Sequence, residues 1–427
     1  MSGYVLKNGI IVSANKKPNT GILGISGEKI VSHELSENKI IIDLKEKSYV
    51  YPSLINTHDH LQGNYRPSVG PKDGEFYLTW QPWDKDLKSS DTFKERSKLS
   101  REELYTLSSY KCIFSGVTTV NDHFPHALNK NILPKLPIRA IMEYGIAHEA
   151  TSYDLKWGDG IKEEHEKAVK NNWPFITHLC EGFDEESMHS VETLEKMGVL
   201  DSHCLFIHCI AMSNEDIKKV AEAGASISIC SSSNKLMFNV TAKVREMLKA
   251  KINLTLGTDS AATGSANLLA EMANFRQVYQ KMYGEDIGAK KIFEMVTCNS
   301  AKAFWMSDRI GSLDEGKLGD VLVLKAKKDD PYENIAGASM KDIELLTLAG
   351  KPIYGEMRFL DLLGGELPKG YSEVIVGKKP MFVIGNPASL YQEIRNRVGF
   401  KKEIDFLPFE PAEENKVVDT ILNKEAK

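Results

Sequence analysis

Two histidines one residue apart stand at the end of an apolar stretch, where they could bind a metal ion. The stretch PSLINTH (52–58) runs directly into Asp59 and His60, so His58 and His60 flank a single residue. In an extended strand, side chains two positions apart point to the same face, so the two imidazoles would converge. Imidazole nitrogens are common ligands of Zn²⁺. Taken alone, the pair is equally compatible with a solvated loop.

Further titratable side chains follow other apolar stretches in the same way. The stretch PFIT precedes His178, and Glu181 comes three residues later; CLFI precedes His208, and INLTLGT precedes Asp259. A single buried histidine is usually structural. Burying several unpaired titratable groups, however, costs on the order of several kcal/mol unless a metal ion or a hydrogen-bond network takes them up. The combined set therefore predicts a metal centre.

The elements that must position these side chains lie between residues 51 and 310. Strand-like runs alternate there with amphipathic helical runs such as NEDIKKVAEAGA and VREMLKAK, which predicts parallel strands covered by helices, in an open sheet or a closed barrel. Such folds place their sites at the carboxyl ends of the strands. The expected strands lie at 52–58, 116–123, 138–147, 174–182, 204–211, 225–233 and 252–260, with an eighth within 148–160.

Both ends of the chain have a different character. Residues 1–50 and 311–360 read as short hairpins, which predicts one small discontinuous β-sandwich built from both ends around the barrel at 51–310. Residues 361–427 are predicted to be a C-terminal extension, with one helical patch in SLYQEIRNRVG.

Composition narrows the class of partner. The 427 residues carry 54 Lys and Arg against 59 Asp and Glu, a net charge of −5 that gives no overall attraction to nucleic acid or to anionic membranes. No run approaches the ~18 apolar residues of a membrane span, and the N-terminus is unlike a secretory signal. The six cysteines form no CxxC pair, which favours free thiols in a reducing cytoplasm. We expect a cytoplasmic enzyme with a small-molecule substrate that could form a homo-oligomer.

A combination of motifs gives the chain a family resemblance over about residues 1–355. The motifs INTHDHL, GVTTVND, FITHLCEG, FIHC, SISICSSSNKL, LTLGTDSA and IGSLDEGKLGDVLVL resemble the amidohydrolase superfamily, in its cytosine deaminase and chlorohydrolase-like branch. That branch includes adenosylhomocysteine and methylthioadenosine deaminases, guanine deaminases and triazine hydrolases. The resemblance implies an α/β fold, a (β/α)₈-type, TIM-like metal-dependent hydrolase barrel with one divalent ion.

The resemblance also implies roles for individual residues. A single ion, Zn²⁺ in first place with Fe²⁺ or Mn²⁺ as alternatives, would be bound by His58, His60, His178 and Asp259. Asp259 would also accept a proton from the attacking water, Glu181 would shuttle a proton, and His208 would orient the water. No lysine stands at the fifth-strand position that bridges two ions in other relatives, which favours one ion.

The chain departs from this branch in two places. A histidine-bearing fourth strand is not visible between 138–147 and 174–182, so a substrate contact would be missing or supplied from elsewhere. The spacing in SSSNKL differs from the usual one, so Asn234 and Lys235 receive no role.

Substrate contacts are predicted from aromatic and histidine residues near the strand ends. Trp83, in the loop at 61–90, His123 and His148 are the candidates, and His126 is a further possibility. The alternative is that the loop is held by buried tryptophans and that these histidines are structural. The remaining histidines, His33, His165, His189 and His203, are interpreted as structural or solvated.

The leading functional hypothesis is a metal-dependent hydrolase that deaminates an aminated nitrogen heterocycle or an amidine-like small molecule. One alternative is a ring-opening amidase or a dechlorinating hydrolase that uses the same water. An alternative from another class is a non-catalytic scaffold on the same fold. The intact ligand set and Glu181 favour an enzyme.

Overall fold

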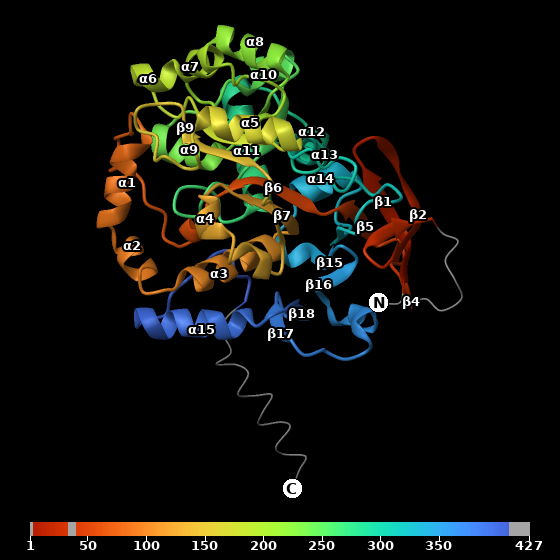
Figure 1. Ribbon diagram of the computed structural model, residues 1–427. Helices are drawn as coiled ribbons and strands as arrows, with labels where there is room; N and C mark the ends of the chain where they lie inside the picture. Colours follow the sequence, from red (N-terminus) through yellow and green to blue (C-terminus); the bar gives the residue numbers. More distant parts are fainter. Residues whose placement is uncertain (1–2, 33–39, 410–427) are drawn as a thin grey trace.

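The computed structural model describes residues 3–32 and 40–409 (Figure 1). His33, interpreted from the sequence as structural or solvated, lies outside these residues. Within the described ranges, no helix combines the length and the apolar character that a membrane crossing requires.

Parallel strands form the centre of the molecule, as the sequence predicts. One sheet has the order β6-β7-β8, and a second has the order β13-β12-β11-β10-β9, with every pairing parallel. Their bounds are β6 Leu54–Asp59, β7 Val117–Asp122, β8 Arg139–Ala140, β9 Gly145–Glu149, β10 Phe175–Leu179, β11 Cys204–His208, β12 Ser226–Ile229 and β13 Asn253–Leu256.

The two sheets are linked by side chains at the β6–β13 side. Thr57 of β6 donates its hydroxyl proton to the Leu256 carbonyl, with an oxygen–oxygen distance of 2.9 Å, and its Oγ1 lies 2.9 Å from that of Thr255. Beyond the strands, the Asp259 amide donates to the His58 carbonyl at 3.1 Å. The outer strands of the two sheets, β6 and β13, therefore lie against each other near the predicted ligands His58 and Asp259.

The eighth strand lies elsewhere than the sequence predicts. The run 138–147, taken as one strand, contains two, β8 and the start of β9, and residues 150–160 form turns and no strand. Tyr144, between the two strands, turns its hydroxyl to the Asp122 carbonyl at 2.8 Å. Gly145 then lies against helix α5, where a Cβ would meet the Glu164 carbonyl oxygen at 2.2 Å. These contacts separate the two strands, although the apolar run itself is nearly continuous.

Helices lie between the strands and begin at recognisable caps. Ser100 and Glu103 form a capping box at α3, and Ser213 and Asp216 form another at α8, which ends at Gly224 with a φ of 74°. The helices are α1 Trp80–Ser89, α2 Asp91–Arg96, α3 Arg101–Ile113, α4 His126–Asn129, α5 Ile161–Asn171, α6 Glu185–Met188, α7 Ser190–Met197, α8 Asn214–Ala223, α9 Ser231–Phe238, α10 Val244–Lys249, α11 Leu268–Tyr283, α12 Ala289–Met295, α13 Cys298–Ala303, α14 Pro331–Ala336 and α15 Pro387–Val398.

Strands from both ends of the chain share one ten-stranded sheet. Its order is β17-β18-β16-β15-β14-β5-β1-β2-β3, and β4 pairs with β1. The N-terminal and C-terminal parts meet where β5 pairs antiparallel with β14. The strands are β1 Tyr4–Ser13, β2 Lys16–Ser26, β3 Lys29–Val31, β4 Ile40–Asp43, β5 Ser48–Pro52, β14 Val321–Lys325, β15 Ile343–Leu348, β16 Lys351–Glu356, β17 Tyr371–Val376 and β18 Lys379–Ile384.

The segment after residue 360 contributes to this sheet and to the helical layer. Strands β17 and β18 extend the sheet beyond β16, which the sequence analysis did not anticipate. The helical patch in SLYQEIRNRVG is confirmed as part of α15, which packs beside α3 (Figure 1).

A buried ion pair connects the parallel strands to the ten-stranded sheet. Arg139 on β8 binds both carboxylate oxygens of Asp320, which precedes β14, and Asp320 also accepts the Ala349 amide proton at 2.7 Å. The Asp320 side chain is 6% exposed. Removing one partner of a buried pair leaves a charge without compensation.

We predict that Arg139→Met lowers the free energy of unfolding by about 3 kcal/mol, because the Asp320 carboxylate stays buried without its cation. Urea denaturation followed by circular dichroism would measure the change. Lys94→Met removes an exposed ion pair with Asp91 and serves as the control, with no measurable change expected. Equal unfolding midpoints for Arg139→Met and the parent protein would contradict the prediction.

Candidate metal centre

The two histidines of the His-Asp-His motif lie at the carboxyl end of β6. His58 is fully buried, and neither of its ring nitrogens has a hydrogen-bond partner among the described residues. The rings of His58 and His60 meet edge-on, with centroids 4.7 Å apart. The two imidazoles therefore converge, as the sequence predicts.

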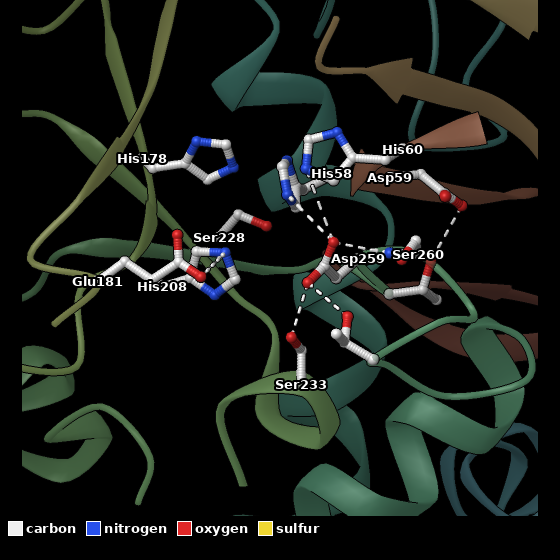
Figure 2. A network of polar contacts seen from close by, with 12 residues as sticks. His58, Asp59, His60, His178, Glu181, His208, Ser228, Ser233, Asp259 and Ser260 are labelled. Carbon is white, nitrogen blue, oxygen red and sulfur yellow. Dashed lines mark hydrogen bonds and ion pairs between the residues drawn. The ribbon is translucent and has the colours of Figure 1, made fainter. Parts of the chain in front are cut away.

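His178 reaches the same place from β10. Its Nδ1 lies 2.8 Å from the His148 carbonyl oxygen, which can only accept, so Nδ1 carries the proton and donates it. This leaves the Nε2 lone pair of His178 free. Ring nitrogens of His58, His60 and His178 all lie within 4.8 Å of one another. Figure 2 shows the three rings pointing toward a common centre.

Asp259 lies on the other side of this centre, in the loop after β13. Its Oδ1 is 3.8 Å from Nε2 of His58 and 3.7 Å from Nε2 of His60. Its Oδ2 accepts hydrogen bonds from the hydroxyls of Ser233 and Thr263 at 2.6 and 2.9 Å (Figure 2). The carboxylate is thus held by hydroxyls on one oxygen and directed at the imidazoles with the other.

Glu181 and His208 form the remaining side of the site. Oε1 of Glu181 is 3.4 Å from Nε2 of His208, and both side chains are buried. Nδ1 of His208 donates to Oδ1 of Asn234 at 2.7 Å, which orients the ring. Asn234 received no role in the sequence analysis because its spacing was atypical. Only the fold brings the Asn234 amide to His208, so the sequence carried no signal for this role.

The backbone is strained where the site residues are presented. His208 and Asp259 adopt φ values of 68° and 51°, and Cys180 and Cys209 beside them adopt 50° and 52°. Non-glycine residues rarely occupy this left-handed region, at a cost of about 1–3 kcal/mol each. The surrounding packing therefore holds these four residues where they lie.

Burial holds the imidazoles of His58, His178 and His208 neutral. Burial lowers the pKa of His58 well below its ordinary value, with further lowering by His60 and His123. Burial lowers the pKa of His178 in the same way. His208 also has a lowered pKa, because burial outweighs the attraction of Asp259. Neutral imidazoles are the form that binds metal ions.

The two carboxyl groups differ in their protonation. Burial raises the pKa of Glu181 well above its ordinary value, and the charges of Asp259 and Glu149 raise it further. Burial acts on Asp259 in the same direction, but His60, His208 and the hydrogen bonds from Ser233 and Ser260 outweigh it and lower the pKa overall. Asp259 is therefore an anion beside a protonated Glu181.

These residues fit a divalent cation. Three imidazoles and one carboxylate form a donor set suited to Zn²⁺, and the ring nitrogens of His58 are buried there without a hydrogen-bond partner among the described residues. Oδ1 of Asp259 faces the rings of His58 and His60. It is not one of the atoms that lie within 4.8 Å of one another, which are ring nitrogens of the three histidines. Each residue that the sequence proposed as a ligand borders the same centre.

The predicted substrate contacts differ in their surroundings. His148 lies on β9, the fourth parallel strand, so the missing histidine-bearing fourth strand is present and that departure was wrong. The error arose because 138–147 was counted as one strand. Burial lowers the pKa of His148 to about 3, and its ring lies 4.9 Å from that of Trp80 and 4.7 Å from that of Trp157.

The other predicted substrate-contact residues make hydrogen bonds to backbone carbonyls, as structural side chains do. Nε2 of His123 donates to the Ala147 carbonyl at 2.9 Å, although its ring also lies 4.6 Å from that of His178. His126 donates in the same way to Tyr144. Trp83 donates to the Val69 carbonyl at 3.0 Å and packs on a cluster around Met237. Contact of His123, His148 or Trp83 with a substrate stays a prediction.

Trp157 is a site residue that the sequence analysis missed. Its ring lies 5.2 Å from that of His123 and 6.1 Å from that of His60. It comes from the segment 148–160, within which the eighth strand was predicted. A tryptophan in a polar turn after a histidine was the available signal.

The loop after β6 closes over the strand ends. The amides of Val69 and Tyr77 donate to the carbonyls of Ala262 and Met237 at 2.8 and 2.9 Å, and the Phe183 amide donates to the Leu78 carbonyl at 2.9 Å. These bonds attach the loop to segments that follow β10, β12 and β13. The loop therefore limits access of solvent to the metal centre.

A buried lysine beneath the site was also missed. Lys111 of α3 is 1% exposed, and its Nζ lies 2.9 Å from Oδ2 of Asp59 and 2.7 Å from Oδ1 of Asn64. The ammonium also donates to Thr258 Oγ1 at 3.0 Å and to the Asp259 carbonyl at 3.3 Å. A helical lysine reads as exposed in a sequence, and only the fold brings its partners together.

Known proteins resemble this chain in both sequence and fold. Residues 170–353 match the Amidohydrolase family. A 5-methylthioadenosine/S-adenosylhomocysteine deaminase of Pyrococcus abyssi is 26% identical over 385 residues, 77% of this chain and 88% of that protein. An atrazine chlorohydrolase of Arthrobacter aurescens complexed with zinc has a TM-score of 0.66 at 19% identity, over 82% of this chain and 95% of its own. An adenosine deaminase of Xanthomonas campestris with bound zinc has a TM-score of 0.67 at 15% identity, over 93% and 98%.

The fold and the family match together define a hydrolase. The resemblance to the amidohydrolase superfamily found in the sequence is confirmed by the family match over residues 170–353 and by the similarity to the deaminase. The two solved structures share its fold.

We predict that Lys111 and Asp59 are strongly coupled. Lys111→Met leaves a buried carboxylate without its cation, so unfolding should become about 3–5 kcal/mol easier. Adding Asp59→Asn removes that charge, so the double variant should lose at least about 1 kcal/mol less than the sum of the two single changes. Denaturation of all four proteins gives this coupling energy.

The exposed pair of Lys88 and Asp84 provides the matched control. Its side chains are 62% and 31% exposed, so its coupling should stay near 0.5 kcal/mol or below. Additive effects of Lys111→Met and Asp59→Asn would show that the buried contact carries no special stability.

Proposed function

We propose that the chain is a divalent-metal-dependent hydrolase that deaminates a nitrogen heterocycle carrying an amino group. The observation that carries this proposal is the convergence of three imidazoles and the Asp259 carboxylate beside Glu181, whose pKa burial raises. The relative from Pyrococcus abyssi, similar over most of both chains, supports an adenine-bearing nucleoside as the substrate class.

The metal ion would be held by His58, His60, His178 and Asp259. When bound, a cation such as Zn²⁺ supplies Lewis acidity that lowers the pKa of a water molecule to about 7. Fe²⁺ or Mn²⁺ would suit the same donors.

The protein groups around the centre divide the proton transfers between them. Asp259 is an anion directed at the centre and can accept a proton from the attacking water. His208, oriented by Asn234 through its protonated Nδ1, presents the Nε2 lone pair and can hold the water by accepting a hydrogen bond from it. Glu181 is protonated and lies next to His208, so it can donate a proton to the departing nitrogen. The reaction then releases ammonia from the attacked carbon.

We extend the proposal to the architecture and setting of the enzyme. The contacts between β6 and β13 support closure of the parallel strands as one (β/α)₈ barrel over residues 51–310. We infer that the β domain predicted as a sandwich of 1–50 and 311–360 also takes in β17 and β18 from the predicted C-terminal extension. The free, mostly buried cysteines support a cytoplasmic setting, and the charge supports a small-molecule substrate.

We predict that the zinc-loaded protein releases ammonia from at least one aminated purine. A screen of adenine nucleosides, guanine, pterins, pyrimidines and triazines would detect it with a coupled ammonia assay. Prolonged chelation should abolish turnover, and Zn²⁺ should restore it, because the histidines alone cannot activate water. Halide release or ring opening without ammonia would support the other hydrolase classes, and no turnover of any compound by metal-loaded protein would support a scaffold.

We predict that Glu181→Gln lowers kcat by at least about 10²–10⁴-fold and leaves the metal content unchanged. Glutamine keeps the size of the side chain but cannot transfer a proton, and Glu181 is not needed as a ligand. Steady-state kinetics and elemental analysis on the same preparation measure the two quantities. Glu222→Gln, at an exposed position on α8, is the control and should match the parent enzyme. Full activity in Glu181→Gln would remove the proton-transfer role.

A further inference from the structure

Three side chains of different types converge at the end of β11 that lies away from His208. His165 comes from α5, Asp201 from the turn before β11, and Cys204 is the first residue of that strand. One potential ligand atom of each lies within 4.8 Å of the other two. At about 3.3 Å per residue, Cys204 and His208 are roughly 13 Å apart along β11. This group, called here the lower cluster, is therefore separate from the candidate metal centre.

The spacing of the lower cluster suits a small tetrahedral cation. Nε2 of His165 is 3.1 Å from Oδ2 of Asp201, and Sγ of Cys204 is 3.9 Å from Oδ1 of the same carboxylate. An ion held at about 2.0–2.2 Å by nitrogen and oxygen and at about 2.3 Å by sulfur would separate such ligands by roughly 3.3–3.6 Å. Only small side-chain movements separate the observed positions from coordination.

The imidazole of His165 has a buried nitrogen that the protein does not satisfy. Nε2 makes no hydrogen bond within residues 3–32 and 40–409, although the Asp201 oxygen is only 3.1 Å away. The ring N–H direction therefore does not point at that oxygen. A cation bound by both Nε2 of His165 and Oδ2 of Asp201 would lie to one side of the line between these two atoms. The observed direction of the ring nitrogen is compatible with such a position. The ring is 6% exposed and fixed edge-on against Phe175 at 5.6 Å.

A fourth candidate ligand and an entry path are present. Nδ1 of His203 is 3.6 Å from Oδ1 of Asp201, and it too is buried without a hydrogen bond from the described part of the chain. Its ring stacks on Trp305 with centroids 4.4 Å apart. The Asp201 side chain is 41% exposed, so an ion can reach the cluster from solvent.

We propose that His165, Asp201 and Cys204 form a second divalent-cation site, completed by His203 or by water. Mixed nitrogen, oxygen and sulfur donors favour Zn²⁺ over Mg²⁺ or Ca²⁺, which prefer oxygen ligands alone. The ion would fasten α5 to the start of β11, below the strands that carry the catalytic residues, so its role is structural.

Binding of the ion would replace the hydrogen bond of the Cys204 thiol with a bond between sulfur and the metal. In the cation-free chain, the Cys204 S–H donates to the Val199 carbonyl, with a sulfur–oxygen distance of 3.1 Å. On binding, the thiol proton leaves to solvent and the sulfur becomes a thiolate ligand of the ion. One proton is released for each ion bound, and no electron is transferred.

Cobalt titration of the full-length protein tests this site without measuring activity. The protein is freed of metal by chelation and equilibrated with Co²⁺, and elemental analysis counts the ions retained per chain. Thiolate coordination gives a near-ultraviolet charge-transfer absorption that imidazole and carboxylate ligands do not give. We expect this absorption in the parent protein, its loss in Cys204→Ser, and one ion fewer per chain in that variant.

The controls separate this site from the proposed catalytic one. Cys230 has its sulfur beside His58 and His208, so Cys230→Ser tests the only other thiol that groups with histidines in the described residues. This variant should keep the absorption. The difference of one ion between the parent and Cys204→Ser does not depend on how many ions bind at the strand ends, so failure of the proposed function would leave the test intact.

His165→Asn is a second variant for the case in which Cys204→Ser fails to fold, and it should also lose one ion. Absence of the absorption in the parent protein would overturn the proposal. So would its persistence in Cys204→Ser, or equal ion counts in the parent and a folded variant. The lower cluster would then be an ion pair of His165 and Asp201 beside an ordinary buried thiol.

Discussion

The arrangement of the metal centre depends on one buried positive charge, the ammonium of Lys111. Burying such a charge is unfavourable unless an anion and further hydrogen-bond acceptors surround it. Asp59 provides the anion from the middle of the His-Asp-His motif, and Thr258 provides an acceptor from the residue before Asp259. One side chain of α3 therefore fixes both segments that carry predicted ligands. If either segment moved, the Lys111 ammonium would be exposed to solvent or left buried without its hydrogen-bond acceptors.

The same network explains how the site balances its charges. Lys111 neutralises Asp59, and burial keeps Glu181 protonated, so Asp259 is the anion left facing the imidazoles. The rings of His58 and His178 are neutral because burial and mutual repulsion oppose their protonation. A centre lined by one carboxylate and several free nitrogen lone pairs attracts a cation. The strained backbone at His208 and Asp259 is held in place by the same packing.

The sequence predicted the parts of this site that follow from local patterns. His58, His60, His178, His208 and Asp259 each end an apolar run, and the position of parallel strand ends in a sheet then brings them together. Lys111 and Asn234 could not be found in this way, because a lysine on a helix and an asparagine in a serine-rich turn gain meaning only from distant partners. Trp157 lies in a turn whose course depends on how β9 packs against α5. The fourth strand was misplaced for a related reason, since an apolar run does not reveal that Tyr144 bonds across to the preceding strand.

The ten-stranded sheet has a consequence for how the protein is made. The hydroxyl of Tyr49 on β5 bonds to the carbonyl of Lys328, which lies 279 residues later in the chain, and β5 pairs with β14 in the same region. A ribosome adding about 5–20 residues per second needs roughly 14–56 s to cover that distance. During that time, one edge of β5 lacks its partner strand. The tyrosines and the valine of β5, which are buried in the folded protein, are then exposed to the crowded cell. Nascent chains of this protein should therefore depend on chaperones that shield the N-terminal hairpins until β14 emerges.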